Sequence, residues 1–530
     1  MKTRFLNFNL ILFGLIIFSG IFVLSTSASA ATYYVKNGGN DSLSGLDDAN
    51  AWETIAKVEA TVTSGDMVYF RSQDVWESSI TSGVVLHATS GVIYDGATYG
   101  LGTRAKFKSN AVSSYNNWST ADLNESNIIF RGFDIDSNDQ TSLDGIGIGY
   151  VADKDISGIT VDNCTVHNTG RYGIIVSNSG GHKTSNVQIL NTETYDCLYA
   201  TGIDVYASWN TPGNQNETVL VRNCISHNNL EGFSIVNDSK NVTLEYNRAY
   251  DNIHDGILVR TSPDYEGGEN VFSAPINMIV RYNVIYNNAD TGIRIYSPSA
   301  LTMSGAFYGN LLYENGQPSI GDCAEFSVIS SNATDDAFGA GTVFDIYNNT
   351  FYSLTKACTN SARLVNLGLW ANLEGAEVNF KNNILYAGNF TELFIDGAPV
   401  VNHSNNLFYS TTLGRTLVKT ETTDYTSTAV NTWEPTAQNT DPQFNGGTLP
   451  TGFTGIYGTD MLPNTNYFAT TSGPTINNGA TLGSPYDGNI NTAGTDNPIA
   501  RLAGAYDIGA YEYQGADITA PNAPSGLSVD

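Results

Sequence analysis

Basic residues are scarce in this chain of 530 residues. It holds 24 lysines and arginines against 52 aspartates and glutamates, which gives a formal net charge of −28. A field of this sign repels phosphate groups and anionic lipid headgroups, so we expect neither nucleic acid nor a membrane surface as a partner. Charged residues make up only 14% of the chain, against roughly 25% in ordinary domains. Apolar residues still reach 41%, which excludes a disordered tail.

Cysteine and histidine are also few. The six histidines form no HExxH motif and the five cysteines no CxxC pair, so we expect neither a zinc site nor a disulfide scaffold. Cys323 and Cys358 fall in consecutive repeats of the kind described below and could pair in an oxidising compartment. Cys164 and Cys224 lie two repeats apart, too far for a disulfide. Stability must therefore come from a large hydrophobic core.

Long apolar runs are absent after the first thirty residues. Lys2 and Arg4 precede an apolar run from Leu10 to Leu24, which is followed by Ala28-Ser29-Ala30. This order is typical of a secretory signal peptide, with cleavage expected after Ala30. The run is shorter than the roughly 20 residues that span a bilayer. We therefore predict a secreted, extracellular protein.

A repeat organises the middle of the chain. Asparagine recurs at intervals of 23 to 39 residues, and a glycine with an alternating apolar stretch such as Gly256-Ile257-Leu258-Val259-Arg260 follows several of these positions. Alternation of period two marks a strand with one buried face. Short strands in a repeat of this length predict an all-β fold, a single-stranded parallel β-helix. The recurring residues are Asn163, Asn191, Asn223, Asn247, Asn283, Asn310, Asn349, Asn383 and Asn406.

Stacking of successive coils predicts three rows of side chains. The asparagines should sit in tight turns and form one ladder of amides. Arg222, Glu245 and Arg281 hold equivalent positions with alternating charge, so we interpret them as an exposed ion ladder outside any site. An aromatic stack is expected three residues after the later asparagines, at Tyr250, Tyr286, Tyr313, Tyr352, Tyr386 and Tyr409.

Both ends of the repetitive region resemble known proteins. The stretches 33–42 and 51–55 at the start, and 441–444 and 507–513 at the end, are similar to the caps of right-handed parallel β-helix proteins among secreted bacterial carbohydrate enzymes, the pectate-lyase-like superfamily. The resemblance covers about residues 31–515 and implies the right-handed form of the solenoid. It does not select a chemistry, because lyases, hydrolases, epimerases and non-catalytic surface proteins share this architecture.

The predicted organisation has five segments. A short amphipathic helix over Ala51–Ala60 is expected to cap the open end of the solenoid. Residues 517–529 resemble the linker and first strand of a fibronectin type III module. We expect the protein to be a monomer. The segments are 1–30, a signal peptide; 31–127, the N-terminal cap and first coils; 128–410, the β-helix core; 411–515, an irregular segment packing on or capping the helix; and 516–530, the linker and module start.

Chemistry-bearing side chains gather on consecutive coils. Counting from each glycine, the alternation turns Asp204, Tyr206, His254, Arg260, Arg294 and Tyr296 outward, while Glu231 and Asp255 occupy the turn just before it. Trp209 and Tyr265 lie in flanking loops and, with Asp204, Tyr206 and Tyr296, could bind sugar rings. The predicted site therefore lies between about Asp204 and Tyr296.

Three functions fit these residues. In β-elimination from a uronate, His254 would remove a proton while Arg260 and Arg294 neutralise the substrate carboxylate. In hydrolysis, Glu231 and Asp255 would act as a carboxylate pair about 5 Å apart. The third function is non-catalytic binding of a polysaccharide at a cell surface. Structural roles also remain open: turn capping for the two carboxylates, an exposed solenoid histidine, and salt bridges from the arginines to Asp255 and Asp290.

A second resemblance concerns metal binding. Glu231-Gly232-Phe233 and Asp255-Gly256-Ile257 are similar to the turns that carry Ca²⁺ ligands in family-9 pectate lyases, which implies calcium as the cofactor and Glu231 and Asp255 as its ligands. Leu258 stands where that family has a further acidic ligand. We favour an enzyme over a binder, and a lyase acting on an acidic polysaccharide over a hydrolase.

Overall fold

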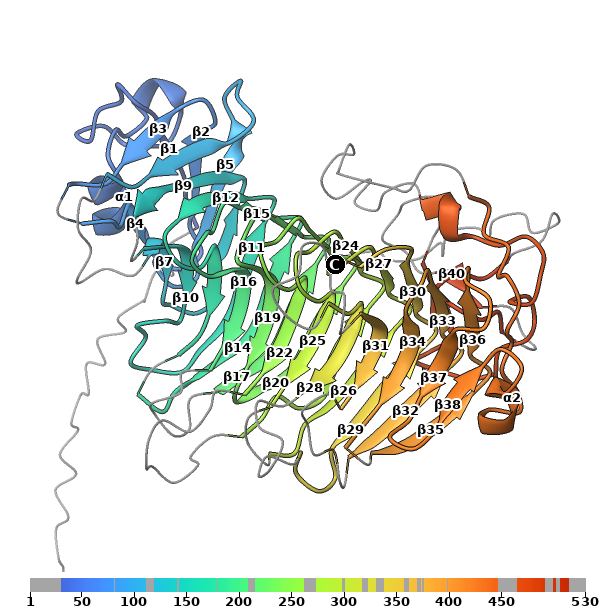
Figure 1. The fold of residues 1–530 in the computed structure, drawn as a ribbon. Coiled ribbons are helices and arrows are strands. Elements are labelled where there is room, and N and C mark those ends of the chain that lie inside the picture. Colours follow the sequence, from blue (N-terminus) through green and yellow to red (C-terminus); the bar gives the residue numbers. More distant parts are fainter. Residues whose placement is uncertain are drawn as a thin grey trace, which may run out of the picture.

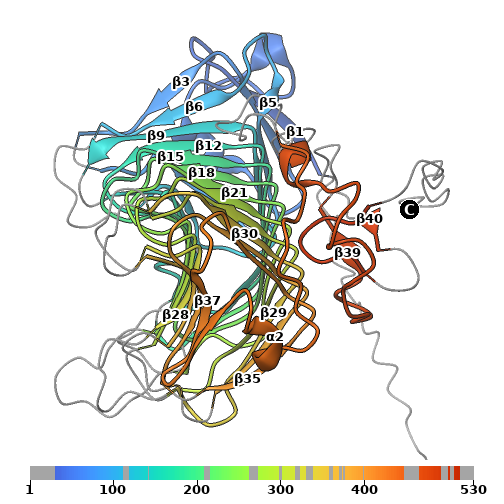
Figure 2. The ribbon, with the colours of Figure 1, turned by 45° about the vertical axis from the view of Figure 1, so that its right-hand side comes forward.

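From β2 (Met67–Arg71) to β37 (Thr416–Lys419), strands succeed one another in rotation among three parallel sheets, here called A, B and C, which enclose one core (Figures 1 and 2). The computed structural model describes residues 30–80, 82–110, 119–140, 143–178, 180–207, 215–261, 273–297, 301–316, 323–329, 338–356, 362–368, 373, 376–397, 399–446, 465–490, 499–501 and 506–513. These strands pair in parallel with their equivalents one coil away, for example β17 (Gln215–Arg222) with β20 (Ser239–Glu245). The predicted right-handed parallel β-helix is confirmed.

Sheets A and B form two of the three sides. Sheet A contains β1 (Thr32–Val35), β2 (Met67–Arg71), β5 (Ile93–Tyr99), β8 (Ile129–Arg131), β11 (Ile156–Asp162), β14 (Lys183–Leu190), β17 (Gln215–Arg222), β20 (Ser239–Glu245), β23 (Met278–Arg281), β26 (Ser304–Tyr308), β29 (Val343–Tyr347), β32 (Glu377–Lys381) and β35 (Val400–Ser404). Sheet B contains β3 (Val75–Glu77), β6 (Ala105–Lys108), β9 (Phe133–Gln140), β12 (Thr165–Thr169), β15 (Glu193–Tyr195), β18 (Ile225–His227), β21 (Arg248–Tyr250), β24 (Val284–Tyr286), β27 (Leu311–Tyr313), β30 (Thr350–Ser353), β33 (Ile384–Ala387) and β36 (Leu407–Ser410).

Sheet C carries the candidate residues. It contains β4 (Leu86–His87), β7 (Ser119–Leu123), β10 (Asp144–Ile148), β13 (Ile174–Val176), β16 (Thr201–Tyr206), β19 (Glu231–Val236), β22 (Ile257–Arg260), β25 (Ile293–Tyr296), β28 (Phe326–Ile329), β31 (Arg363–Leu367), β34 (Thr391–Ile395), β37 (Thr416–Lys419) and β38 (Asp424–Thr426), the last antiparallel to β37. Alternate residues such as Ile203 and Val205 enter the core, so Asp204 between them faces outward.

The ends of the solenoid carry short helices. At the N-terminal end lie η1 (Asp48–Asn50) and α1 (Ile55–Thr61), whose buried Val58 joins the core. This confirms a short helix near the N-terminus, beginning four residues later than predicted. At the other end lie α2 (Val430–Trp433), η2 (Thr465–Phe468) and the antiparallel pair β39 (Gly488–Asn489) and β40 (Ile499–Ala500). Over the described residues, no helix is long and apolar enough to cross a membrane.

The asparagine repeat forms a ladder, but in two rows rather than the predicted one. Asn163, Asn191 and Asn223 have φ values of 52°, 48° and 54° and occupy the left-handed turn position itself. Those from Asn247 to Asn406 stand one place later and point inward, where each backbone N–H donates to the side-chain oxygen of the next coil, as Asn310 does to Asn349 at 3.0 Å. The single-ladder prediction was wrong because asparagine suits both neighbouring positions of this corner.

A second, unpredicted amide ladder runs along the corner that leads into sheet C. Asn229, Asn252, Asn288 and Asn315 each accept a backbone N–H from the coil before, and Asn315 donates to Glu325. The glycine row lies against it. A Cβ at Gly232 would lie 2.4 Å from the carbonyl oxygen of Gly256. The recurring glycine therefore reflects close approach between coils beside this ladder.

The aromatic stack is confirmed in the residues predicted for it and extends toward the N-terminus. Ring centroids of Tyr250 and Tyr286 lie 5.1 Å apart and those of Tyr286 and Tyr313 4.9 Å apart. His167, Tyr195 and His227 continue the row one coil at a time. The C-terminal segment covers part of the stack through Phe444, Tyr467 and Phe468, as Figure 2 shows beside sheets A and B.

The predicted ion ladder and cysteine states can be compared with the structure. Glu245 lies 3.2 Å from Arg222 and 2.6 Å from Arg281, which confirms the pairing, although its side chain is only 4% exposed. The ladder is therefore half-buried rather than exposed.

Cys164, Cys197 and Cys224 are free and buried, and Cys323 is disulfide-bonded. Cys358 lies outside the described residues.

The buried ladder should contribute strongly to stability. In Asn349→Ala, the backbone N–H and Nδ2 of Asn310 lose the acceptor that now lies 3.0 Å from each. Buried donors without acceptors cost about 1–3 kcal/mol each, so we expect the free energy of unfolding to fall by about 3 kcal/mol in denaturant titrations. The exposed Asn402→Ala on β35 is the control, with a loss below about 0.5 kcal/mol. Equal losses in the two variants would show that the ladder is not a main source of stability.

Candidate functional site

The candidate residues occupy two adjacent rows on the outer face of sheet C. In one row, Asp204, Ser234, Leu258 and Arg294 are register partners on β16, β19, β22 and β25. In the other, Tyr206, Val236, Arg260 and Tyr296 follow one another in the same coils. Tyr206, Arg260 and Tyr296 are all half-buried. The second row therefore places a cation between two aromatic side chains along the direction of the solenoid.

A chain of polar contacts links a buried acid to a half-exposed base. Ser234 lies against Asp204 and 3.2 Å from the hydroxyl of Thr201, which donates to Glu231 Oε2 at 2.9 Å. Glu231 Oε1 is 4.0 Å from His254 Nδ1, an ion-pair distance. The three contacts that run from Asp204 to Glu231 need one proton each, but the Ser234 and Thr201 hydroxyls supply only two. The third proton must therefore be on Asp204. The geometry thus favours a neutral Asp204 facing an ionised Glu231.

The electrostatics agree with this assignment. Burial raises the pKa of Asp204 to about 7, against the lowering effects of Ser234 and the charge of Arg260. Burial also tends to raise the pKa of Glu231. The contacts with His254 and Thr201 and the charge of Arg260 outweigh burial and hold this pKa below its usual value. The contact with Glu231 raises the pKa of His254. Near neutral pH the two carboxyl groups therefore differ in protonation.

Arg294 is bound by two carboxylates. Its Nη2 lies 3.2 Å from Asp255 Oδ1 and also contacts Asp290 Oδ2. Burial raises the pKa of Asp255 to about 7 despite the charge of Arg294. Asp204 on the outer face of sheet C and Asp255 at the turn before Gly256 are each only 2% exposed, so neighbouring groups bury both carboxyl groups. The predicted salt bridges are present for Arg294.

Arg260 differs from Arg294. Within the part of the chain that the structure describes, its guanidinium makes no ion pair, and its Nε is buried without a hydrogen-bond partner. The charges of Glu231 and Asp204 act on it without direct contact. A half-buried guanidinium that makes no ion pair with a described residue can bind a carboxylate from outside the protein. No such availability follows for Arg294.

The proposed calcium ligands do not form a metal site in the described residues. Glu231 is engaged by Thr201 and His254, and Asp255 by Arg294. No group of three or more acidic, histidine or cysteine side chains in the described ranges is placed to hold a metal. A neutral or arginine-bound carboxyl group is a poor Ca²⁺ ligand. Calcium binding stays a prediction.

Some aromatic residues of the predicted site cannot be located, and others were overlooked. Trp209 and Tyr265 lie outside the described residues. One coil earlier, Tyr172 stacks on Tyr206 with ring centroids 6.4 Å apart. Arg171 lies over Tyr172 and 3.4 Å from Asp144, a buried carboxyl group whose pKa burial raises to about 7. Tyr172 precedes Gly173, the turn position that Glu231 and Asp255 occupy, so the repeat itself could have identified it.

Comparison with known proteins supports the fold. Residues 156–351 match the family model described as a right-handed β-helix region. No curated protein matched the chain. Among solved structures, the pectate lyase Pel9A is 15% identical with a TM-score of 0.50, over 92% of this chain and 97% of that one.

Two further structures are similar at lower scores. A rhamnogalacturonan lyase is 16% identical, with a TM-score of 0.44 over 67% of this chain and 87% of that one. The A-module of the Azotobacter vinelandii mannuronan C-5 epimerase AlgE4 is 16% identical, with a TM-score of 0.39 over 73% and 94%. Similarity at these scores carries no argument about this chain, whose chemistry rests on its own residues.

The protonation of Asp204 should be visible in the pH dependence of stability. Its pKa is about 7 when folded against an ordinary 3.8, so the folded state binds a proton that the unfolded state has released over this range. The stabilisation is complete below about pH 4 and is lost as pH rises through about 7. We expect the unfolding midpoint to fall between pH 5 and pH 8, and to fall less in Asp204→Asn. The exposed Asp153→Asn should match the wild type; an unchanged slope in Asp204→Asn would contradict a neutral Asp204.

Proposed function

We propose that this chain is a secreted polysaccharide lyase that cleaves an acidic, uronate-containing polysaccharide by β-elimination. The observation that carries the proposal is Arg260, a half-buried guanidinium without an ionic partner in the described residues of a strongly acidic protein. An overall negative field repels an anionic substrate, so recognition needs a local cation that is not already neutralised. The flanking Tyr206 and Tyr296 provide faces on which sugar rings can stack.

His254 is the proposed base. Its Nδ1 faces Glu231, which leaves Nε2 to take the proton from C5 of the uronate. Arg260 binds the substrate carboxylate and stabilises the charge that develops as the C5–H bond breaks. The C4=C5 double bond then forms, the C4–O bond breaks, and water protonates the leaving oxygen. Glu231 orients His254 and raises its basicity, and Thr201 fixes Glu231 in place.

Hydrolysis is the second candidate. The pKa of Glu231 is lowered and that of Asp255 raised to about 7, a difference typical of an acid–base carboxyl pair. Against this, the Asp255 side chain is only 3% exposed and binds Arg294, so it is poorly placed to reach a glycosidic oxygen. A non-catalytic binder would produce neither unsaturated nor reducing products, and assays for both on uronate polymers and neutral glycans separate the three functions.

Single substitutions test the two central roles. His254→Ala should lower elimination about 10²–10⁴-fold because the base is lost, and Arg260→Ala about 10²–10³-fold because the carboxylate loses its counter-ion. The rate is measured from the ultraviolet absorbance of the unsaturated product. Thermal unfolding should change by only a few degrees in His254→Ala, whose side chain is 40% exposed.

His182→Ala is the matched control, because this histidine is also part-exposed and near an aspartate but lies directly before β14 of sheet A, outside the candidate residues. It should retain the wild-type rate. Wild-type elimination by both His254→Ala and Arg260→Ala would place the chemistry elsewhere.

The pairing of Glu231 with His254 predicts a shift in the pH–rate profile. Because Glu231 raises the pKa of His254, the neutral base forms only above its ordinary pKa of 6.5. Glu231→Gln removes that effect, so the acidic limb of the rate profile should move to lower pH while the maximal rate falls with the weaker base. Full profiles of initial rate against pH measure both changes. A fall in rate with an unmoved limb would mean that His254 is not the titrating base.

A further inference from the structure

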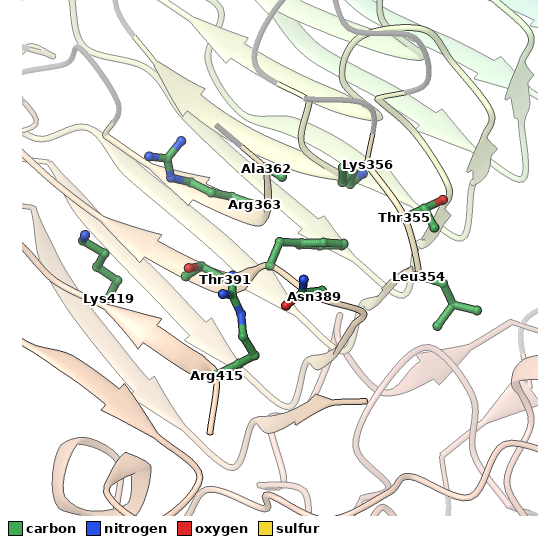
Figure 3. A pocket seen from close by; sticks show the side chains of 10 residues that line it. Leu354, Thr355, Lys356, Ala362, Arg363, Asn389, Thr391, Arg415 and Lys419 are labelled. Atoms are coloured by element: carbon green, nitrogen blue, oxygen red, sulfur yellow. The ribbon is translucent and has the colours of Figure 1, made fainter. Parts of the chain in front are cut away.

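A cavity of about 500 Å³ opens in the last coils of sheet C (Figure 3). Its lining comes from the segment after β30 and from the turns that lead into β31, β34 and β37. In earlier coils the same corner carries Glu231 and Asp255. The cavity therefore lies on the same side of the solenoid as the candidate site, farther toward the C-terminal end.

The lining is basic in an otherwise acidic protein. Lys356, Arg363, Arg415 and Lys419 all contribute, and the described lining contains no aspartate or glutamate. Lys356 is neutralised by its buried contact with Glu325. Arg363 lies over the ring of Phe394, with its guanidinium carbon 4.2 Å from the ring centroid. Phe390 also lines the cavity, so the pocket combines positive charge with an aromatic surface.

Two of these cations are unpaired. Arg415 and Lys419 make no ion pair with any described residue, and Arg415 Nε is buried without a hydrogen-bond partner. Leaving a buried charged donor unsatisfied costs more than leaving a neutral one, so such a group inside a cavity indicates a ligand that supplies the acceptor. Guanidinium donors match the paired oxygens of a carboxylate or a sulfate ester.

We propose that this pocket binds the anionic groups of an acidic polysaccharide, as a second contact point beyond the candidate site. Lys419 follows Phe394, Asn366, Ser327 and Arg294 in one row of register partners along sheet C. Four coil spacings of about 4.8 Å separate Arg294 from Lys419, roughly 19 Å in all. One polymer lying along sheet C can therefore contact both places. The identity of the ligand rests on the proposed function, whereas the anion site rests on the pocket itself.

The test compares two double variants of the full chain that remove equal charge. Arg415→Gln/Lys419→Gln removes the unpaired cations of the pocket. Lys183→Gln/Lys240→Gln removes two cations from β14 and β20 on sheet A and is the control. Binding is measured by calorimetry with polygalacturonate, with dextran sulfate and with neutral galactan. Loss of a charge-assisted contact corresponds to about tenfold or more in affinity, so we expect at least that loss in the pocket variant and none in the control.

The polymers distinguish the sources of the anion. A loss with polygalacturonate assigns the pocket to carboxylates, and a loss confined to dextran sulfate assigns it to sulfate esters. Wild-type affinity in the pocket variant, an equal loss in both double variants, or no wild-type binding to either polyanion would overturn the proposal. The exposed Lys419→Gln alone, with a smaller expected loss in the same direction, provides the test should the double variant fail to fold.

The outcome is separable from that of the proposed function. If elimination depends on His254 and binding is unchanged in the pocket variant, the proposed lyase activity stands and the anion site in the pocket is wrong. If binding depends on Arg415 and Lys419 but no elimination product forms, the anion site in the pocket stands and the proposed lyase activity is wrong.

Discussion

Every coil of this solenoid must turn sharply at corners where backbone donors are buried, and the side-chain amides satisfy them. Along one corner, the asparagines from Asn247 to Asn406 each accept a backbone N–H from the neighbouring coil, and Asn406 donates to Glu434 at the end of α2. Along another, the row from Asn229 to Asn315 ends at Glu325. The first asparagine of each row accepts the backbone N–H of a buried cysteine, and the last donates its own N–H to a glutamate carboxylate. Since an unsatisfied buried donor costs about 1–3 kcal/mol, these rows fix the register that aligns every other row.

That register is what assembles a candidate site from residues far apart in the chain. The glycines beside the second ladder let coils approach closely, and the residue before each glycine is held at the corner where Thr201, Glu231 and Asp255 stand. Two positions beyond each glycine lies the outward row that holds Asp204, Ser234 and Arg294. The same repetition places a neutral acid, an ionised acid, a histidine and an arginine without an ion pair to any described residue within three coils. The same register continues the outer row of sheet C from Arg294 to Lys419 in the basic pocket.

Period-two alternation and the recurring asparagine were enough to predict the solenoid, the aromatic stack and the face of the candidate site. They did not distinguish the turn asparagines from the ladder asparagines, because one residue type suits both adjacent positions. They left open whether the arginines form salt bridges to Asp255 and Asp290, and they did not reveal that Asp204 and Asp255 are buried. Burial of these carboxyl groups depends on packing between coils, which residue spacing along one strand does not encode. The same spacing could not distinguish Arg294, which forms both bridges, from Arg260, which makes no ion pair with a described residue. The basic pocket joins turns of coils beyond Gly316, where Glu325, Leu364 and Glu392 replace the recurring glycine that marks the candidate site.

The most direct test of the central claim is a crystal structure of His254→Ala with a bound uronate oligosaccharide. The proposed function predicts a sugar carboxylate within about 3 Å of the Arg260 guanidinium, with C5 facing the space left by the imidazole and a ring stacked near Tyr206 or Tyr296. An oligosaccharide bound away from β22, with Arg260 making no contact to it, would contradict the assignment of this face as the active site.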